Sequence, residues 1–441
     1  MKNKKTLGII SLGCDKNRVD SEKLLASIQN DYVITNDIYQ TQILVINSCG
    51  FLQSAQEEAI SMIMEYNQLR EDAKLEKIIL TGCIPQRFVN DIFDDLVEVD
   101  GFLGTYDYDL FNQTVNDCYK GLRVNNVGKG QALKSTQRTV TTPLHYAYLK
   151  IADGCDNHCT YCAIPAIRGK YHSTPIEQLV EEAEGLGEIS ELILVAQDVT
   201  RYGIDLYGKK SLCTLIKRLS ALDNIASIRL LYCYPDMIDN ELIDQLINND
   251  KLVKYLDIPL QHASDKVLKV MNRKGSGNDY LQLINTLKQR VKGIALRSTF
   301  IAGFPGETEE DFEILKQFIK NAKFFNAGFF AYSQEEGTPA ARLTNQIDNK
   351  VKKDRVKQLY ALQKQISKEN LSQFKGKQIT VICDGIDYDK QCFVGRAQFQ
   401  APEIDGVVYF TASEDEMVQQ GQFYQVKITS CTAYDLKGRK I

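Results

Sequence analysis

The chain has 441 residues, of which 44% are hydrophobic and 25% charged, and its formal net charge is -4 at pH 7. This length predicts about three domains with hydrophobic cores, and the weakly acidic balance argues against a chain-wide basic surface for nucleic acid. The longest apolar runs have strand length, far below the ~20 residues of a membrane-spanning helix, and no secretory signal is visible. We therefore expect a cytoplasmic protein without a membrane segment.

The hydrophobic pattern predicts an α/β protein of three parts. Residues 1–122 alternate short β runs with helical stretches, which is typical of a parallel sheet covered by helices, and a polar linker is expected at 123–142. Strand and helix candidates alternate again over 143–370, which predicts a partial (β/α) barrel, although periodicity alone does not separate this from a doubly wound sheet. Residues 371–441 hold five short β runs with glycine turns, which predicts a small all-β barrel of OB-like type.

Three of the twelve cysteines share one topological position. Cys14, Cys49 and Cys83 each follow a predicted strand and precede a predicted helix. The carboxyl ends of parallel strands lie on one edge of a sheet, so the three thiols should converge, and the helix N-termini behind them favour thiolates. The pattern predicts a metal site, with small buried core residues as the alternative. The six cysteines outside this set and the next share no such position and are expected to have no function.

A second set of three cysteines lies in "GCDNHCTYC", directly after a predicted strand. Cys155, Cys159 and Cys162 are close enough in sequence to wrap one inorganic centre. A structural zinc ion would need a fourth ligand, for which His158 and His172 are candidates. A 4Fe-4S cluster held by three thiolates would instead leave one iron open to a small molecule.

The spacing CxxxCxxC, with Tyr161 just before the last cysteine, resembles the radical SAM superfamily. The resemblance implies that the amino and carboxylate groups of S-adenosylmethionine (SAM) fill the open position, and that SAM is cleaved to a 5'-deoxyadenosyl radical. It also makes Tyr161, Gln197, Arg297 and Gly303 candidates for contacts with SAM, since the last three lie on or at the ends of later strands. No catalytic acid or base is assigned from the sequence.

Over nearly the whole chain, the two cysteine sets and the small C-terminal β-barrel together resemble the methylthiotransferases, whose third domain is called TRAM. In that family the N-terminal cysteines hold a second 4Fe-4S cluster, whose open iron carries a sulfur or methylthio group. The resemblance implies that Cys14, Cys49 and Cys83 are those ligands, that SAM serves as both methyl donor and radical source, and that an electron donor and a sulfur source are partners.

One branch of this family modifies adenosines in tRNA, and another modifies an aspartate side chain of small-subunit ribosomal protein S12. Five segments of this chain resemble the ribosomal-protein branch, namely "SLGCDKNRVDSE", "CAIPAIRGKYHS", "IPLQHASDKVLKVMNRKG", "YSQEEGTPA" and "GRAQFQAPEIDGVV". The tRNA branch tends to read Gln-Met-Asn where this chain has Asp15, Lys16 and Asn17.

The charge of the C-terminal part is an independent indication. From Leu371 onward there are eight Lys or Arg and nine Asp or Glu, whereas a module that grips tRNA is expected to be basic. We therefore expect ribosomal protein S12 as the substrate. A tRNA-modifying enzyme is the alternative within the family, and a non-catalytic zinc-containing protein that binds RNA or the ribosome is the alternative of a different class.

Overall fold

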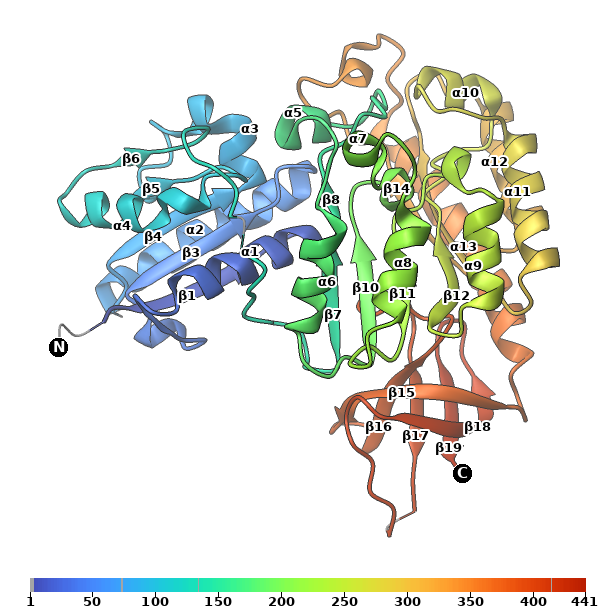
Figure 1. Ribbon diagram of the computed structural model, residues 1–441. Coiled ribbons are helices and arrows are strands. Elements are labelled where there is room, and N and C mark those ends of the chain that lie inside the picture. The colour runs from blue at the N-terminus through green and yellow to red at the C-terminus, as the bar shows by residue number, and fades with distance from the viewer. Residues whose placement is uncertain (1–3, 73, 134, 414) are drawn as a thin grey trace.

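The computed structural model describes residues 4–72, 74–133, 135–413 and 415–441. Three bodies follow one another along the chain: an α/β body, a half-barrel with helices on its outer face, and a small β-barrel below it (Figure 1). This confirms the predicted fold class. The predicted domain ranges also include residues 1–3, 73, 134 and 414, which lie outside the described residues.

The N-terminal body is a six-stranded parallel sheet, in the order β2-β1-β3-β4-β5-β6. Its strands are β1 (Thr6–Ser11), β2 (Val33–Ile34), β3 (Ile43–Ser48), β4 (Lys77–Gly82), β5 (Gly101–Phe102) and β6 (Val124–Asn125), and its helices are α1 (Asp15–Ile28), η1 (Ile38–Gln40), α2 (Gln53–Asp72), α3 (Cys83–Ile92), η2 (Tyr108–Leu110) and α4 (Phe111–Tyr119). Strand β3 is buried along its whole length because helices cover both faces of the sheet. Strand β6 lies inside the range predicted as linker, since two residues are too few to give a periodic pattern.

The central body is a six-stranded parallel sheet whose strands are neighbours in chain order, β7-β10-β11-β12-β13-β14. These strands are β7 (Tyr146–Lys150), β10 (Glu191–Val195), β11 (Ile228–Leu230), β12 (Leu252–Asp257), β13 (Ala295–Ala302) and β14 (Asn326–Ala331), and a small antiparallel pair is formed by β8 (Ala152–Asp153) and β9 (His172–Ser173). A doubly wound sheet reverses its strand order at a switch point, whereas this sheet does not. The central body is therefore the predicted partial barrel.

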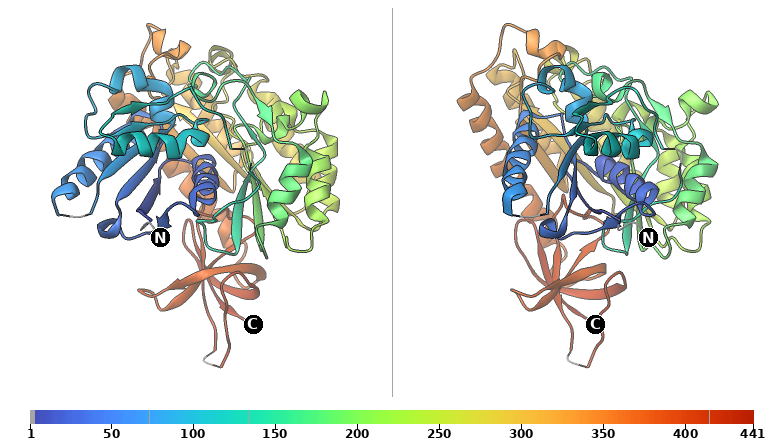
Figure 2. Two further views of the ribbon diagram at one scale, coloured as in Figure 1. Left: turned by 60° about the vertical axis from the view of Figure 1, so that its left-hand side comes forward. Right: turned by 90° about the vertical axis from the view of Figure 1, so that its left-hand side faces the viewer.

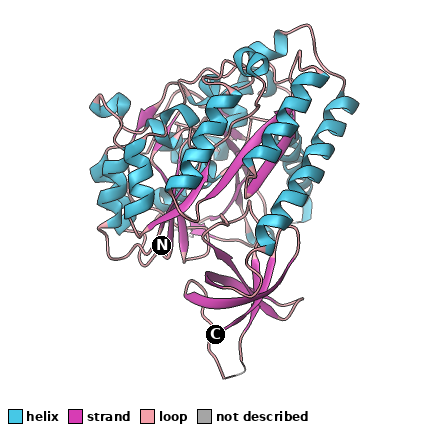
Figure 3. Ribbon diagram, turned by 90° about the vertical axis from the view of Figure 1, so that its right-hand side faces the viewer, coloured by secondary structure: helices cyan, strands magenta, loops and turns pink. Residues whose placement is uncertain are grey.

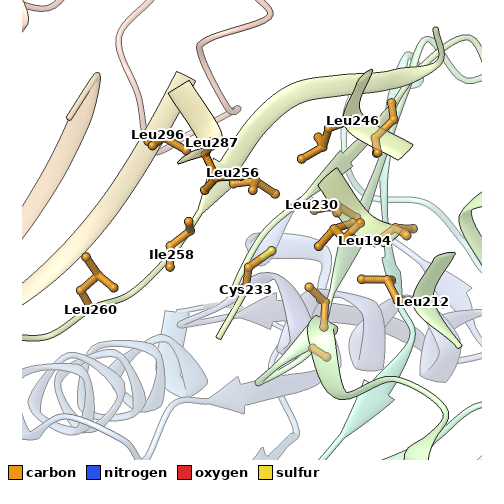
Figure 4. Packing of buried hydrophobic residues seen from close by; sticks show 14 of the residues in the cluster. Leu194, Leu212, Leu230, Cys233, Leu246, Leu256, Ile258, Leu260, Leu287 and Leu296 are labelled. Atoms are coloured by element: carbon orange, nitrogen blue, oxygen red, sulfur yellow. The ribbon is translucent and has the colours of Figure 1, made fainter. Parts of the chain in front are cut away.

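Helices cover the outer face of this half-barrel (Figure 3). The helical elements of the central body are α5 (Ile164–Arg168), α6 (Ile176–Glu184), η3 (Val199–Arg201), α7 (Ile204–Tyr207), α8 (Leu212–Ser220), η4 (Pro235–Met237), α9 (Asn240–Asn248), α10 (Asp265–Val270), α11 (Gly277–Arg290), α12 (Glu309–Ala322), η5 (Pro339–Arg342) and α13 (Asn349–Ser372). Leu194, Leu230 and Leu256, from three adjacent strands, gather in the core beneath the helices (Figure 4). No helix in the described part of the chain is both long and apolar enough to cross a lipid bilayer.

Helix α13 leads into the C-terminal body, a closed barrel in the order β15-β16-β17-β19-β18. Its strands are β15 (Gln378–Asp387), β16 (Cys392–Ala397), β17 (Val408–Thr411), β18 (Phe423–Cys431) and β19 (Leu436–Lys440). This barrel lies below the strands of the half-barrel, and the N-terminal body packs beside the half-barrel (Figure 2). The prediction of a small OB-like barrel is confirmed.

A buried ion-pair network joins the half-barrel to the C-terminal barrel. Glu191, at the start of β10, accepts a hydrogen bond from Arg229 Nε at 2.8 Å, and Arg396 of β16 pairs with its other oxygen. Arg396 Nε also donates to Asp384 at 2.9 Å. Burial by itself would raise the pKa of Glu191, but the two guanidinium groups hold this pKa at about 2.

We expect Glu191→Gln to destabilise the protein by about 3–5 kcal/mol, because it leaves two buried guanidinium groups undercompensated. In the wild type the Glu191 contribution should be fully present above the unfolded-state pKa of about 4.3 and should be lost as the pH falls toward 2. Thermal denaturation between pH 7 and pH 2.5 tests both points. Glu241→Gln, at a side chain that is 59% exposed, is the control and should leave the melting temperature nearly unchanged. A Glu191→Gln protein as stable as the wild type at pH 7 would contradict this expectation.

Candidate functional site

The structure brings Cys14, Cys49 and Cys83 together at one edge of the N-terminal sheet. They follow β1, β3 and β4, which are adjacent in the sheet. The thiols of Cys14 and Cys83 both lie near Asn17 Oδ1, at 4.0 and 3.8 Å. Gly13 has a φ of 91°, and a Cβ placed on it would lie 2.5 Å from Cβ of Cys49. Glycine at this position therefore lets the first strand end approach the second.

The amide of Asn17 fixes the geometry around these thiols. Its Nδ2 donates to the carbonyl oxygens of Leu12 and Ser48, both at 3.1 Å, and these carbonyls belong to two different strand ends. Its Oδ1 is thereby turned toward the cysteines. The same oxygen accepts a hydrogen bond from Arg168 Nη2 at 2.6 Å, so the N-terminal body and the half-barrel meet at this amide.

Arg168 is a buried cation between the two bodies. Its Nη1 donates to Asp20 of α1 at 2.8 Å and to Asp153 of β8 at 2.7 Å, and its Nη2 lies 3.8 Å from the sulfur of Cys83. Lys150 pairs with the same two carboxylates. Burial would raise the pKa of Asp153, but the two cations hold it well below its usual range.

The second cysteine set lies in the loop between β8 and α5. Cys155 N donates to Gly169 O at 3.2 Å and Cys162 N donates to Cys159 O at 3.0 Å, which folds the loop on itself. The sulfur of Cys159 lies 3.8 Å from Tyr234 Oη and 4.0 Å from Arg273 Nη1. All three thiols are thus held at the carboxyl-end side of the half-barrel.

The two cysteine sets face each other. Cys83 of the first set packs against Ala163 and Ile167, which directly follow the second set in the chain. Burial, with the neighbouring cysteines, raises the pKa of both Cys49 and Cys155 to about 11. Binding of a metal centre would therefore release protons from these thiols.

Within the described residues, no three His, Cys, Asp or Glu side chains are arranged to hold a single metal ion. Three thiols are the donors that a 4Fe-4S cluster takes, and its thiolates bind different irons, so they need not point at one atom. The residues present therefore fit such a cluster.

The residues expected to contact SAM occupy different environments. Tyr161 packs in a cluster with Val267 and Phe304, and its hydroxyl accepts a hydrogen bond from Arg273. Gln197 donates to Asp153 at 3.0 Å, while its Oε1 is buried without a partner among the described residues.

Arg297 and Gly303 have protein partners of their own. Arg297 pairs with Asp257 at 2.9 Å and with Asp405 of the C-terminal body at 3.5 Å, so its charge is already compensated. A Cβ on Gly303 would lie 2.4 Å from Cγ of Lys352, and φ is 73°. The approach of α13 and the positive φ both favour glycine at this position.

The sequence analysis did not single out Arg168, Asp153, Tyr234 or Arg273. Arg168 lies in the quoted segment "CAIPAIRGKYHS", six residues after Cys162, but a single arginine in a motif does not reveal its burial. Tyr234 and Arg273 lie more than 70 residues from the cysteine that they contact. Only the tertiary fold brings them to it.

Comparison with known families assigns all three bodies. Residues 149–319 match the model described as Radical SAM superfamily, residues 376–441 match the TRAM domain, and residues 6–104 match Uncharacterized protein family UPF0004.

Curated relatives match the chain over nearly its full length. A protein of Lachnoclostridium phytofermentans named Ribosomal protein uS12 methylthiotransferase RimO is 45% identical over 97% of this chain and 98% of its own. A protein of the same name from Clostridium kluyveri is 43% identical over 99% of this chain and 98% of its own.

Among solved structures, the radical S-adenosylmethionine methyltransferase TsrM from Kitasatospora setae aligns with a TM-score of 0.56 at 15% identity, covering 77% of each chain. The cobalamin-dependent radical enzyme OxsB aligns with a TM-score of 0.50 at 12% identity, over 82% of this chain and 56% of its own. These likenesses show a shared fold.

We expect Arg168→Gln to destabilise the contact between the N-terminal body and the half-barrel by about 3–5 kcal/mol, because Asp20 and Asp153 lose their shared partner. Arg168→Lys keeps the charge but not the planar fork, and should recover part of this loss. Thermal denaturation and limited proteolysis of the 126–142 segment measure the effect. The exposed Arg218→Gln is the control, and an Arg168→Gln protein with wild-type stability and protease resistance would show that the contact is not held by this residue.

Proposed function

The chain belongs to the family of ribosomal protein uS12 methylthiotransferases, and from this premise we propose that it attaches a methylthio group to an aspartate side chain of ribosomal protein uS12. The observation that carries this proposal is the pair of cysteine sets on facing elements, where Cys83 packs against the residues that follow Cys162. Two reactive centres that act on the same substrate carbon must lie close together.

We assign Cys155, Cys159 and Cys162 to a 4Fe-4S cluster that binds SAM. Cys14, Cys49 and Cys83 are assigned to a second 4Fe-4S cluster. When bound, these groups supply a 5'-deoxyadenosyl radical and a methylthio group, while the protein positions the reactants and excludes water.

The chain's own residues would hold this site in shape. Arg273 lies over the ring of Tyr234 at 4.2 Å and within 4.0 Å of Cys159, so a cation and a hydroxyl both face the second set. Arg168 faces Cys83 in the same way. Hydrogen bonds and positive charge near cluster sulfurs are general determinants of cluster potential, so these two arginines should favour the reduced, more negative states.

The SAM pocket is proposed at the end of β10 and beside the second set. Gln197 Oε1 is a buried acceptor without a partner in the described chain, which suits the amino group of SAM. Tyr161, next to Cys162 in the chain, supplies an aromatic wall beside the second set. Arg297 is the weakest of the four candidates because Asp257 and Asp405 already neutralise it.

The substrate assignment draws on two further points. The relatives compared above are named for uS12, and the C-terminal barrel is slightly acidic, which suits a basic protein better than tRNA. The reaction also requires an electron donor and a sulfur source as partners. Because ribosomes are its proposed target, we place the protein in the cytoplasm.

Cells that lack this protein should lose the methylthio mass from the aspartate-containing peptide of uS12, while their tRNA nucleosides stay unchanged. Mass spectrometry of tryptic ribosomal peptides and of digested tRNA measures both in one culture, and complementation with the wild-type gene is the control. Loss of a methylthio nucleoside with an intact uS12 peptide would move the assignment to the tRNA branch.

Cysteine variants test the two clusters separately. Cys155→Ala, Cys159→Ala or Cys162→Ala should abolish SAM cleavage, whereas Cys14→Ala, Cys49→Ala or Cys83→Ala should leave SAM cleavage measurable and stop methylthio transfer. Iron per chain should fall by about half in either group, from about eight irons for two four-iron clusters. Cys213→Ala, at a core position of the half-barrel, is the control. Full product formation by the Cys14, Cys49 or Cys83 variants would refute the second cluster, and a colourless wild type with stoichiometric zinc would refute both.

A further inference from the structure

Lys16 is a buried lysine two residues after Cys14, and its side chain is only 9% exposed. Its ammonium lies 3.2 Å from Asp15 Oδ1 and 3.4 Å from the ring centroid of Tyr232. The first contact is made within α1, while the second crosses from the N-terminal body to the half-barrel. Lys16 therefore lies where the two bodies meet.

The segment 232–234, just after β11, connects this lysine to both cysteine sets. Tyr232 Oη donates to Asp15 Oδ1 at 3.1 Å, beside Cys14, and two residues later Tyr234 Oη lies 3.8 Å from the sulfur of Cys159. Tyr232 has a φ of 61°, which is strained for a bulky side chain. Such strain persists where the surrounding structure enforces it. Here it lets Tyr232 face the first cysteine set and Tyr234 face the second.

Arg168, Arg273 and Lys16 are buried cations close to the cysteine sets, and they differ in spare hydrogen-bonding capacity. Arg168 is saturated by Asp20, Asp153 and Asn17. Arg273 donates to Pro259 O and lies over Tyr234. The ammonium of Lys16 has three N–H donors, and its described contacts are one carboxylate oxygen and one ring face.

Asp15, the neighbour of Lys16, has a hydrogen-bond acceptor that is not used. Asp15 Oδ2 is buried and has no hydrogen-bond partner among the described residues. A donor with a positive charge and a bare acceptor thus stand side by side between the two cysteine sets. A peptide that presents a carboxylate and a backbone N–H would use both the free N–H donors of Lys16 and the bare oxygen of Asp15, whereas a neutral nucleobase presents no carboxylate to the ammonium.

We propose that Lys16 binds the side-chain carboxylate of the substrate aspartate, and that Asp15 Oδ2 accepts a backbone N–H of the same substrate. This assignment rests on the proposed function, because it names the two residues that recognise the charged side chain of that substrate. A carboxylate removed from water requires a compensating cation, and Lys16 has N–H donors to spare.

The test uses the reconstituted full-length enzyme and two fluorescent peptides of the uS12 loop, one with the target aspartate and one with asparagine in its place. Wild type should bind the aspartate peptide at least about tenfold more tightly, which corresponds to about 1.4 kcal/mol. Lys16→Gln should bring this ratio close to one, and Lys16→Arg should keep most of it. Lys23→Gln is the matched control, because Lys23 lies on the same helix and pairs with Glu182 at 2.7 Å.

The aspartate-to-asparagine ratio is internal to each variant, so a general loss of stability does not change it. Iron content and SAM cleavage are measured on the same samples, so that the ratio is compared only between proteins whose metal loading is known. A Lys16→Gln ratio equal to that of wild type, beside a wild type that modifies the aspartate peptide, would overturn this inference alone. A wild type that leaves the aspartate peptide unmodified would overturn the proposed function and with it the premise of the inference.

Discussion

Helix α1 imposes the constraint on which the arrangement of the three bodies depends. Five of its ten buried side chains are polar or charged, and a buried charge without a partner costs several kcal/mol. The partners of the buried charges come from elsewhere, since Arg168 pairs with Asp20 and Arg138 pairs with Glu22. On the more exposed side of the same helix, Arg18 pairs with Glu403 of the C-terminal body. The half-barrel and the linker must therefore meet α1 in one specific orientation. That orientation brings the two cysteine sets face to face.

Much of the architecture could be predicted because each part has a strong local signal. The apolar run "ILVINS" became the fully buried β3, and the five short β runs after residue 371 became a closed barrel. The convergence of Cys14, Cys49 and Cys83 followed from topology, since parallel strands end on one edge of a sheet. Such inferences need only the order of elements along the chain and the period of their apolar residues.

The parts that could not be predicted depend on contacts between distant segments. Nothing in the polar run that includes Asp20 and Glu22 indicates that it is buried, because the hydrophobic pattern reads such residues as solvent-facing. Nothing in the sequence indicates that Arg297 pairs with Asp405, more than 100 residues away. The approach of α13 to Gly303 also depends on the tertiary fold. A sequence pattern indicates that a residue needs an interaction partner, but it does not identify that partner.

The sequence separations of the α1 contacts have a consequence for the time course of folding. Asp20 and Arg168 are 148 residues apart, and Arg18 and Glu403 are 385 apart, so each contact closes a very long loop. Closing a long loop costs conformational entropy before the contact contributes any stabilisation. Such contacts therefore form late. During synthesis the N-terminal sheet is complete well before its partners emerge. The thiols at its edge are then not yet covered by the half-barrel, and they become enclosed only after the later bodies have been made.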